Sequence, residues 1–204
     1  MTQAARETSL IHIAAKRNAA PVNILASLIL TLCLAWPGLA FAGERVTFDN
    51  VRVYPAHGRY VIDLDARVRM RRRPTQALEK GVSLYFNLDV DVFRQRTFWP
   101  DSVERSIRKR YRLFYFELTQ HYRITEIRSG KSVSFKTLDE ASQHLSHIRG
   151  LPLLDVARVR DPGRYRVRVK MGLDYSELPT PLQLQAYTTR RWRLRSEETV
   201  WPLD

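Results

Sequence analysis

Pairs of carboxylates recur in this chain at a spacing of two residues. Asp63 and Asp65 form one pair, and Asp89 and Asp91 form another. Residues i and i+2 of a β-strand share a face, so each pair would present two carboxylates side by side. Two carboxylates in a cleft can carry out glycoside hydrolysis. Because the strands that carry them alternate so regularly, we expect these acids instead to offset arginines across strands.

Histidines supply a second set of candidate ligands. Glu140, His144 and His147 have helical spacing, and three such side chains on one face can hold zinc. A helical wheel, however, turns Glu140 and His147 away from the apolar residues Leu145 and Ile148. The single cysteine, Cys33, lies outside 43–204, so no cysteine of that domain is available to complete a site. We therefore expect a solvated helix face, no metal site and no cofactor.

Motifs for other chemistries are absent from the sequence. It contains no Gly-x-Ser-x-Gly nucleophile elbow, no His-Glu-x-x-His helix and no glycine-rich phosphate loop. An active site needs acids, bases or nucleophiles that converge, and the spacing reveals no such set. We expect a protein that is not an enzyme. An unrecognised envelope hydrolase is the third hypothesis, after the two binding functions given at the end of this section. It would require two carboxylates that converge in a cleft.

Basic residues occupy every second position in several segments. Each such segment would place a row of positive charge on one strand face. The two main rows are Arg164, Arg166, Arg168 and Lys170, and Arg191, Arg193 and Arg195; a third is Arg67, Arg69 and Arg71. Adjacent rows would form a patch that suits phosphates or acidic polymers. The alternative is a solvated face whose arginines pair with aspartates across strands.

An aromatic pair begins a charged segment of the chain. Phe98 and Trp99 are followed by several basic residues, among them Arg105 and Arg108. Tryptophan and arginine are favoured at protein interfaces, so an exposed loop over 94–112 would be an interface loop. If the aromatic side chains instead fill the space between strands, they cap the core.

The elements that must position these residues are mostly strands. Alternation with a period of two is clearest over 164–171, where apolar and basic residues take turns. Such alternation is typical of antiparallel sheets with one solvated face. Strands are predicted over 46–54, 60–70, 82–92, 110–118, 120–128, 152–159, 164–171, 182–188 and 191–201.

Two short helices are expected between the strands. One follows Pro74 and covers 75–80. The other begins at Thr137, where Glu140 completes a capping box, and continues to Ile148 before Gly150 ends it. This pattern favours a mainly β fold, with α+β as the alternative: one antiparallel β-sandwich-like domain over 43–204, with two short helices.

Composition limits the classes of protein. The chain has 204 residues, a formal net charge of +13 and one cysteine. Its 44% apolar and 27% charged residues exclude wholesale disorder and collagen-like repeats. A single cysteine excludes a disulfide framework and a cysteine-based zinc site.

The segment 1–42 is typical of a signal peptide. Lys16-Arg17 precedes a stretch that lacks charge as far as Glu44 and contains an Ala-x-Ala sequence ending at Ala42. A positive start, an apolar core and small residues at this point predict cleavage between Ala42 and Gly43. The alternative is an uncleaved inner-membrane anchor over 19–42. We expect a periplasmic domain, for which nucleic acid is not a partner.

Four motifs, taken in order, resemble a known family. They are YRLFYFELTQHY over 111–122, SFKTLDEA over 134–141, LPTPLQLQA over 178–186 and TTRRWRL over 188–194. Over nearly all of 46–198 the chain resembles a proteobacterial family called domain of unknown function 4390. Arg191 departs from the acid that often precedes the tryptophan there. The resemblance implies a short exported protein with one domain, often encoded beside a membrane sensor kinase of the nitrogen-regulation type. It implies no catalytic residues.

These features lead to a non-enzymatic accessory or interaction protein of the cell envelope. Its expected partner is an envelope protein such as a sensor kinase, contacted through the interface loop. The alternative is a basic module that docks on an anionic membrane surface, either lipid or lipopolysaccharide, through the arginine rows.

Overall fold

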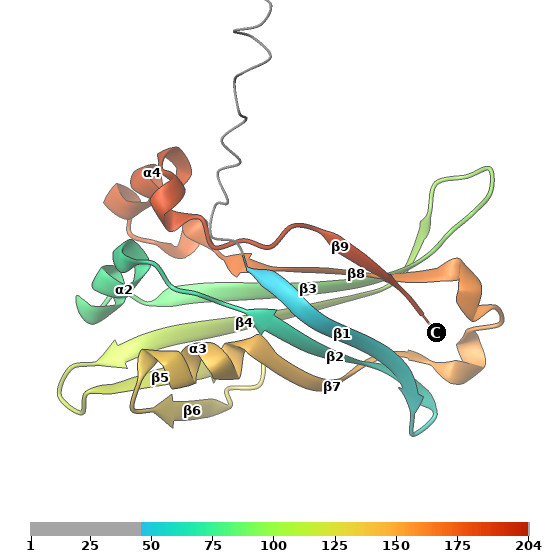
Figure 1. The fold of residues 1–204 in the computed structure, drawn as a ribbon, viewed down its shortest axis with the longest axis horizontal. Helices are drawn as coiled ribbons and strands as arrows, with labels where there is room; N and C mark the ends of the chain where they lie inside the picture. Colours follow the sequence, from blue (N-terminus) through green and yellow to red (C-terminus); the bar gives the residue numbers. More distant parts are fainter. Residues whose placement is uncertain (1–45, 204) are drawn as a thin grey trace, which may run out of the picture. The chain divides into compact units, whose positions relative to one another are not determined.

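A computed structural model describes residues 46–203, in which strands dominate (Figure 1). The smaller sheet consists of β1 (Thr47–Ala56), β2 (Arg59–Arg67) and β7 (His147–Asp155). The larger sheet consists of β3 (Leu84–Arg94), β4 (Ser102–Phe116), β5 (His121–Glu126), β6 (Ser132–Phe135), β8 (Tyr165–Leu173) and β9 (Thr199–Pro202). The α-helices are α2 (Arg72–Glu79), α3 (Leu138–Ser146) and α4 (Thr180–Thr188). Short 3-10 segments are η1 (Val156–Arg158), η2 (Pro162–Arg164), η3 (Tyr175–Glu177) and η4 (Arg190–Trp192).

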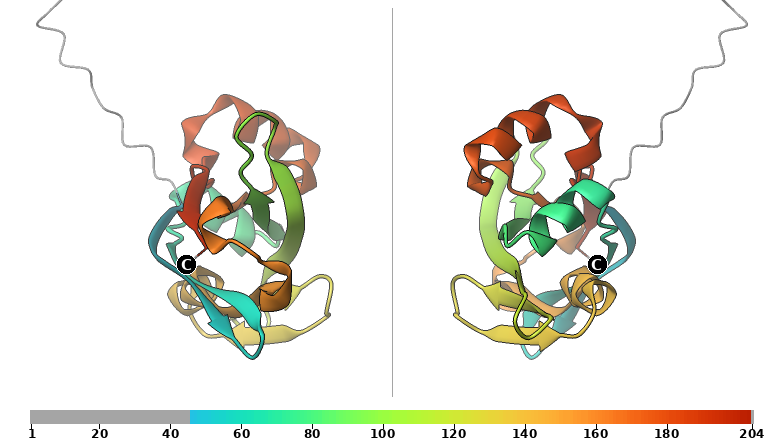
Figure 2. Two further views of the ribbon diagram at one scale, coloured as in Figure 1. Left: turned by 90° about the vertical axis from the view of Figure 1, so that its right-hand side faces the viewer. Right: turned by 90° about the vertical axis from the view of Figure 1, so that its left-hand side faces the viewer.

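The two sheets are antiparallel throughout and share one core. Their strand orders are β1-β2-β7 and β6-β5-β4-β3-β8-β9. In both end-on views, β1 and β4 lie on opposite sides of the domain (Figure 2). Buried residues of both sheets belong to a single hydrophobic cluster. The predicted mainly β, sandwich-like single domain is therefore confirmed.

The predicted alternation of β3 is the clearest feature of the core. Leu84, Phe86, Leu88 and Val90 are each 0% exposed, and they alternate with half-buried residues. Ile62 and Leu64 of β2 are buried from the smaller sheet. Because successive side chains of a strand point to opposite faces, the polar residues between these buried ones face outward on both sheets.

Both predicted helices form, with different bounds. α2 begins three residues before the expected start, so that Pro74 lies within its first turn. α3 has the predicted cap: the Glu140 backbone N–H donates to Thr137 Oγ1 at 3.2 Å. The Glu140 carboxylate accepts from the Lys136 backbone N–H at 3.1 Å, one residue earlier than a standard capping box.

α3 ends earlier than expected, and the chain enters β7 at once. Ile148 is therefore a strand residue and not part of a helix face. Gly150 has a φ of 59°, the left-handed conformation expected of it, but it lies in a bulge of β7 and not at a helix end.

The prediction of strands over 182–188 and 191–201 is wrong in large part. Residues 180–188 form helix α4, and η4 follows before the short strand β9. Pro181 fits the first turn of a helix. Leu182 and Ala186, which alternate as in a strand, are also four residues apart and so share a helix face. A short apolar run of this kind is compatible with both the period of a strand and the period of a helix.

The expected loop over 94–112 is mostly strand. β4 begins at Ser102 and pairs with β3 through Arg94. Charged residues occupy both faces of 104–110, so this half of β4 lacks the apolar alternation that marks a strand. β6 was not expected either.

The predicted signal segment over 1–42, its cleavage site at Ala42 and Gly43, and the alternative anchor over 19–42 lie outside the described residues. Within residues 46–203, no helix combines the length and apolar character needed to cross a membrane.

Candidate functional site

The first carboxylate pair lies on the outer face of the smaller sheet. Asp63 is only 8% exposed, yet several donors surround it. The Gly150 backbone N–H donates to Oδ1 at 2.8 Å, and the Tyr54 hydroxyl donates to Oδ2 at 3.2 Å. The Arg52 guanidinium lies 3.6 Å from Oδ2. Asp63 thus accepts hydrogen bonds from both neighbouring strands of the sheet.

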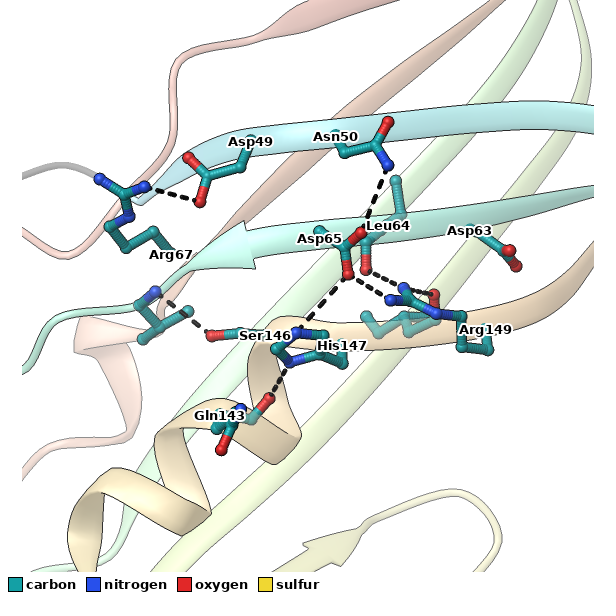
Figure 3. Close-up of polar contacts among 12 residues, drawn as sticks. Asp49, Asn50, Asp63, Leu64, Asp65, Arg67, Gln143, Ser146, His147 and Arg149 are labelled. Carbon is teal, nitrogen blue, oxygen red and sulfur yellow. Dashed lines mark hydrogen bonds and ion pairs between the residues drawn. The ribbon is translucent and has the colours of Figure 1, made fainter.

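Asp65 is paired with arginine, as the sequence predicted for these acids (Figure 3). The Arg149 guanidinium donates to Oδ1 of Asp65 and also, at 2.9 Å, to the Leu64 carbonyl oxygen. His147 Nε2 lies 3.7 Å away. The hydrogen bond from Arg149 is the largest influence on this carboxyl and lowers the pKa of Asp65 below its ordinary value of 3.8. Asp65 therefore serves as an ionised anchor for β7.

The second pair has similar partners on the other sheet. Asp89 lies 4.0 Å from Arg108, and Asp91 accepts from the Ser106 hydroxyl at 2.6 Å. Because the pairs lie on the outer faces of two different sheets, the four carboxylates do not converge.

The histidine cluster of α3 does not assemble. His147 Nδ1 lies 2.7 Å from the Gln143 carbonyl oxygen, and the His144 ring packs against Phe135 with centroids 5.1 Å apart. Across residues 46–203, no three His, Cys, Asp or Glu side chains are grouped closely enough to hold a metal ion.

The first basic row lies on β8, where an acid offsets part of it. Glu198 binds Arg168 at 2.7 Å and Lys170 at 2.5 Å. The hydrogen bond from Lys170 is the main reason that the pKa of Glu198 is lowered. Arg168 also stacks over the Phe93 ring at 4.7 Å. Arg164 belongs to η2 and lies 3.7 Å from Asp161, and Arg166 donates to the Gly163 and Tyr165 carbonyls.

The second row does not share a strand face. Arg191 is in η4 and faces α2, whereas Arg193 and Arg195 line a pocket beside Tyr187. Arg195 forms an isolated bridge with Gly172 of β8, and so lies beside the first row. The structure therefore brings Arg195 near Lys170 but leaves Arg191 in a different surface.

The predicted interface loop is the exposed tip of the β3–β4 hairpin. Phe98 is 89% exposed and Trp99 is 75% exposed. Figure 1 shows this connection projecting at one end of the larger sheet. Arg105 and Arg108 are on β4 itself, opposite Val92 and Asp89. Val92 and Asp89 point to opposite faces of β3, so Arg105 and Arg108 lie on different faces of β4. Arg105, which is opposite Val92, is on the core-facing side.

A groove that no sequence pattern predicts lies at the other end of the larger sheet. It has a volume of about 740 Å³, and its described lining is Met70, Arg71, Arg72, Arg73, Gln76 and Arg191. Alternation predicts that Arg67, Arg69 and Arg71 share a strand face, but β2 ends at Arg67 and α2 begins at Arg72. The groove joins residues more than a hundred positions apart, so spacing could not reveal it.

A second arrangement that sequence reasoning missed links β3, β4 and η3. Arg110 binds Asp174 at 2.9 Å and Glu177 at 2.7 Å, and Asn87 donates to Asp174 at 2.9 Å. Burial opposes ionisation of Asp174, but hydrogen bonds from Ser176, Asn87 and Arg110 outweigh it and lower its pKa. Arg110 and Asn87 thus bind the acids of the η3 segment from β4 and β3, so the network holds these elements together.

The model of the family described as Domain of unknown function (DUF4390) matches residues 43–202. The chain belongs to this family. The match covers both sheets and all the surfaces described above. No curated protein and no solved structure matches the chain. Any function for this DUF4390 domain must therefore be argued from its own surfaces.

Proposed function

We propose that this DUF4390 protein is a non-enzymatic accessory protein of the cell envelope that binds another protein through the β3–β4 tip. The tip is defined as residues 95–103. The exposure of Phe98 and Trp99 carries the proposal, and Val103, which is 60% exposed, is a third exposed apolar side chain within the tip. Burying a large apolar side chain stabilises by about 1.5–3 kcal/mol, so three exposed together favour a surface that becomes covered.

The charges around the tip favour a protein partner over an anionic bilayer. Arg96 and Asp101 lie within the tip, and an ion pair of 3.2 Å between Arg94 and Glu104 closes its base. An anionic bilayer attracts cations but repels Asp101 and Glu104, whereas a protein interface accommodates both signs at its rim. Glu198 also offsets the β8 row on which lipid docking would depend.

Two finer parts of the proposal rest on the sequence. Export depends on the signal segment predicted over 1–42. A sensor kinase of the nitrogen-regulation type is the first partner to test, because the family resemblance implies that such a gene is often adjacent.

Co-purification of membrane proteins with a tagged chain tests the proposal. The variant Phe98→Ser with Trp99→Ser removes both aromatic side chains, and Leu184→Ser with Tyr187→Ser is the matched control. Leu184 and Tyr187 are 67% and 66% exposed on α4, so the control removes a similar exposed pair elsewhere. We expect a co-purifying protein to be lost, by tenfold or more, only with the tip variant.

Binding to vesicles separates the alternative. If the wild-type chain sediments with anionic phosphatidylglycerol vesicles at physiological salt, and the tip variant loses no protein partner, lipid docking replaces the proposal. Equal loss of the partner in both variants would also overturn it.

A further inference from the structure

We propose that the groove between α2 and η4 binds a phosphate monoester group. We call it the arginine groove, defined by Met70, Arg71, Arg72, Arg73, Gln76 and Arg191. Its volume of about 740 Å³ lies in the range typical of small-molecule sites. This site is independent of the tip interface. β3, which has 11 residues, extends about 35 Å between the α2 end and the tip.

Three arginines of the arginine groove lack an acidic partner of the kind that some other arginines of the described residues have. Arg52, Arg67 and Arg110 all have acidic partners. By contrast, no ion pair within residues 46–203 involves Arg72, Arg73 or Arg191. The first turn of α2 contains no acidic residue. Three guanidinium groups that share a groove repel one another unless an anion lies between them.

The backbone that carries these arginines is held firmly. The inner face of α2 buries Pro74, Ala77 and Leu78, and Leu78 is 0% exposed. In η4, the Trp192 side chain is 2% exposed, so this buried indole fixes the neighbouring Arg191. α2 and η4 are in direct contact. The backbone of these arginines therefore starts from a fixed position, so only their side chains have to be ordered when an anion binds.

Phosphate fits this arrangement better than a single carboxylate. A guanidinium presents a planar fork of donors that matches the oxygens of phosphate. A phosphate monoester has three acceptor oxygens and a charge of about −1.5 to −2 at neutral pH, enough to engage several arginines. Gln76 lies one helical turn after Arg72 and adds amide donors on the same side of α2. The shared chemistry could come from a soluble phosphate ester or from a phospholipid headgroup.

Binding measurements on protein purified from cells that express the full-length chain test the site. Glycerol 3-phosphate is the soluble probe, measured by calorimetry in about 150 mM salt. Phosphatidylcholine vesicles with and without phosphatidic acid are the lipid probe. The groove variant is Arg73→Gln with Arg191→Gln. The control is Arg164→Gln with Arg166→Gln, which removes the same charge from the β8 end.

The proposal expects binding of at least one probe, with affinity reduced tenfold or more by the groove variant and unchanged by the control. Binding of glycerol 3-phosphate identifies a soluble ligand; binding of phosphatidic acid vesicles alone identifies a headgroup. Absence of binding to both probes would overturn the proposal. Equal weakening by groove and control variants would do so too, because it would show an effect of net charge only. An unchanged melting temperature verifies that the variants are folded.

Discussion

The backbone N–H of Gly150 donates to the carboxylate of Asp63 at 2.8 Å, across the bulge where β7 departs from regular pairing with β2. Asp63 opposes two residues of β7, Arg149 and Gly150, instead of one. The bulge turns the Arg149 side chain so that it reaches Asp65 and the Leu64 carbonyl. Asp63 and Asp65, which have the spacing of a candidate hydrolytic pair, therefore hold the edge strand β7 against β2.

Replacement of Asp63 by alanine should destabilise the domain. It removes the acceptor of the Gly150 N–H and of the Tyr54 hydroxyl, at a cost of about 1–2 kcal/mol in the free energy of unfolding. Asp63→Asn should cost less, because an amide oxygen can still accept from Gly150. Urea denaturation measures both values. Asp101→Ala in the exposed tip is the control, and an equal effect there would contradict the assigned role.

Stability should depend on pH through Asp65. Its pKa is lowered in the folded protein, so the unfolded chain takes up a proton first as the pH falls. The stabilisation is fully present above the ordinary value of 3.8, and is lost as the pH falls through 3.8 to the folded pKa. Urea denaturation at several pH values should show that the difference between wild type and Asp65→Asn narrows in this window. A difference that stays constant with pH would show that the ion pair with Arg149 contributes nothing.

Gly172 should not tolerate a side chain. A Cβ there would lie 2.8 Å from the Leu194 carbonyl oxygen and 3.0 Å from the Arg195 Cα, both backbone atoms. Gly172→Ala must therefore push the Arg195 segment off β8, at a cost of about 1–3 kcal/mol. At Gly163 the nearest atom is a flexible carboxylate oxygen at 3.4 Å, so Gly163→Ala should change stability by less than about 0.5 kcal/mol. Thermal unfolding of the two variants compares them; equal melting temperatures would refute the close approach.

Alternation allowed most of the fold to be predicted, and its failures have physical causes. β2, β3 and β8 each bury one face, so a period of two marks them clearly. Residues 102–110 of β4 lie in a hairpin with charge on both faces, and their strand character comes from pairing with β3, which the local sequence does not reveal. α4 was not predicted because Leu182 and Ala186 suit either period, whereas the exposed Leu184 suits only a strand.

The candidate surfaces were predictable only where they are local in sequence. Phe98 and Trp99 are adjacent, so their exposure together required only that the segment be a turn. The arginine groove, by contrast, requires Arg191 to meet α2 across the fold. The pairing of Arg168 and Lys170 with Glu198 depends in the same way on where β9 lies.

The most direct test of the interaction proposal is photo-crosslinking in living cells. A benzophenone amino acid replaces Trp99 in one variant and Tyr187 of α4 in the other, two aromatic positions that are 75% and 66% exposed. We predict a discrete crosslinked envelope protein from position 99 and none from position 187, with mass spectrometry identifying the partner. The same crosslinks from both positions, or crosslinks to lipid alone from position 99, would contradict the account.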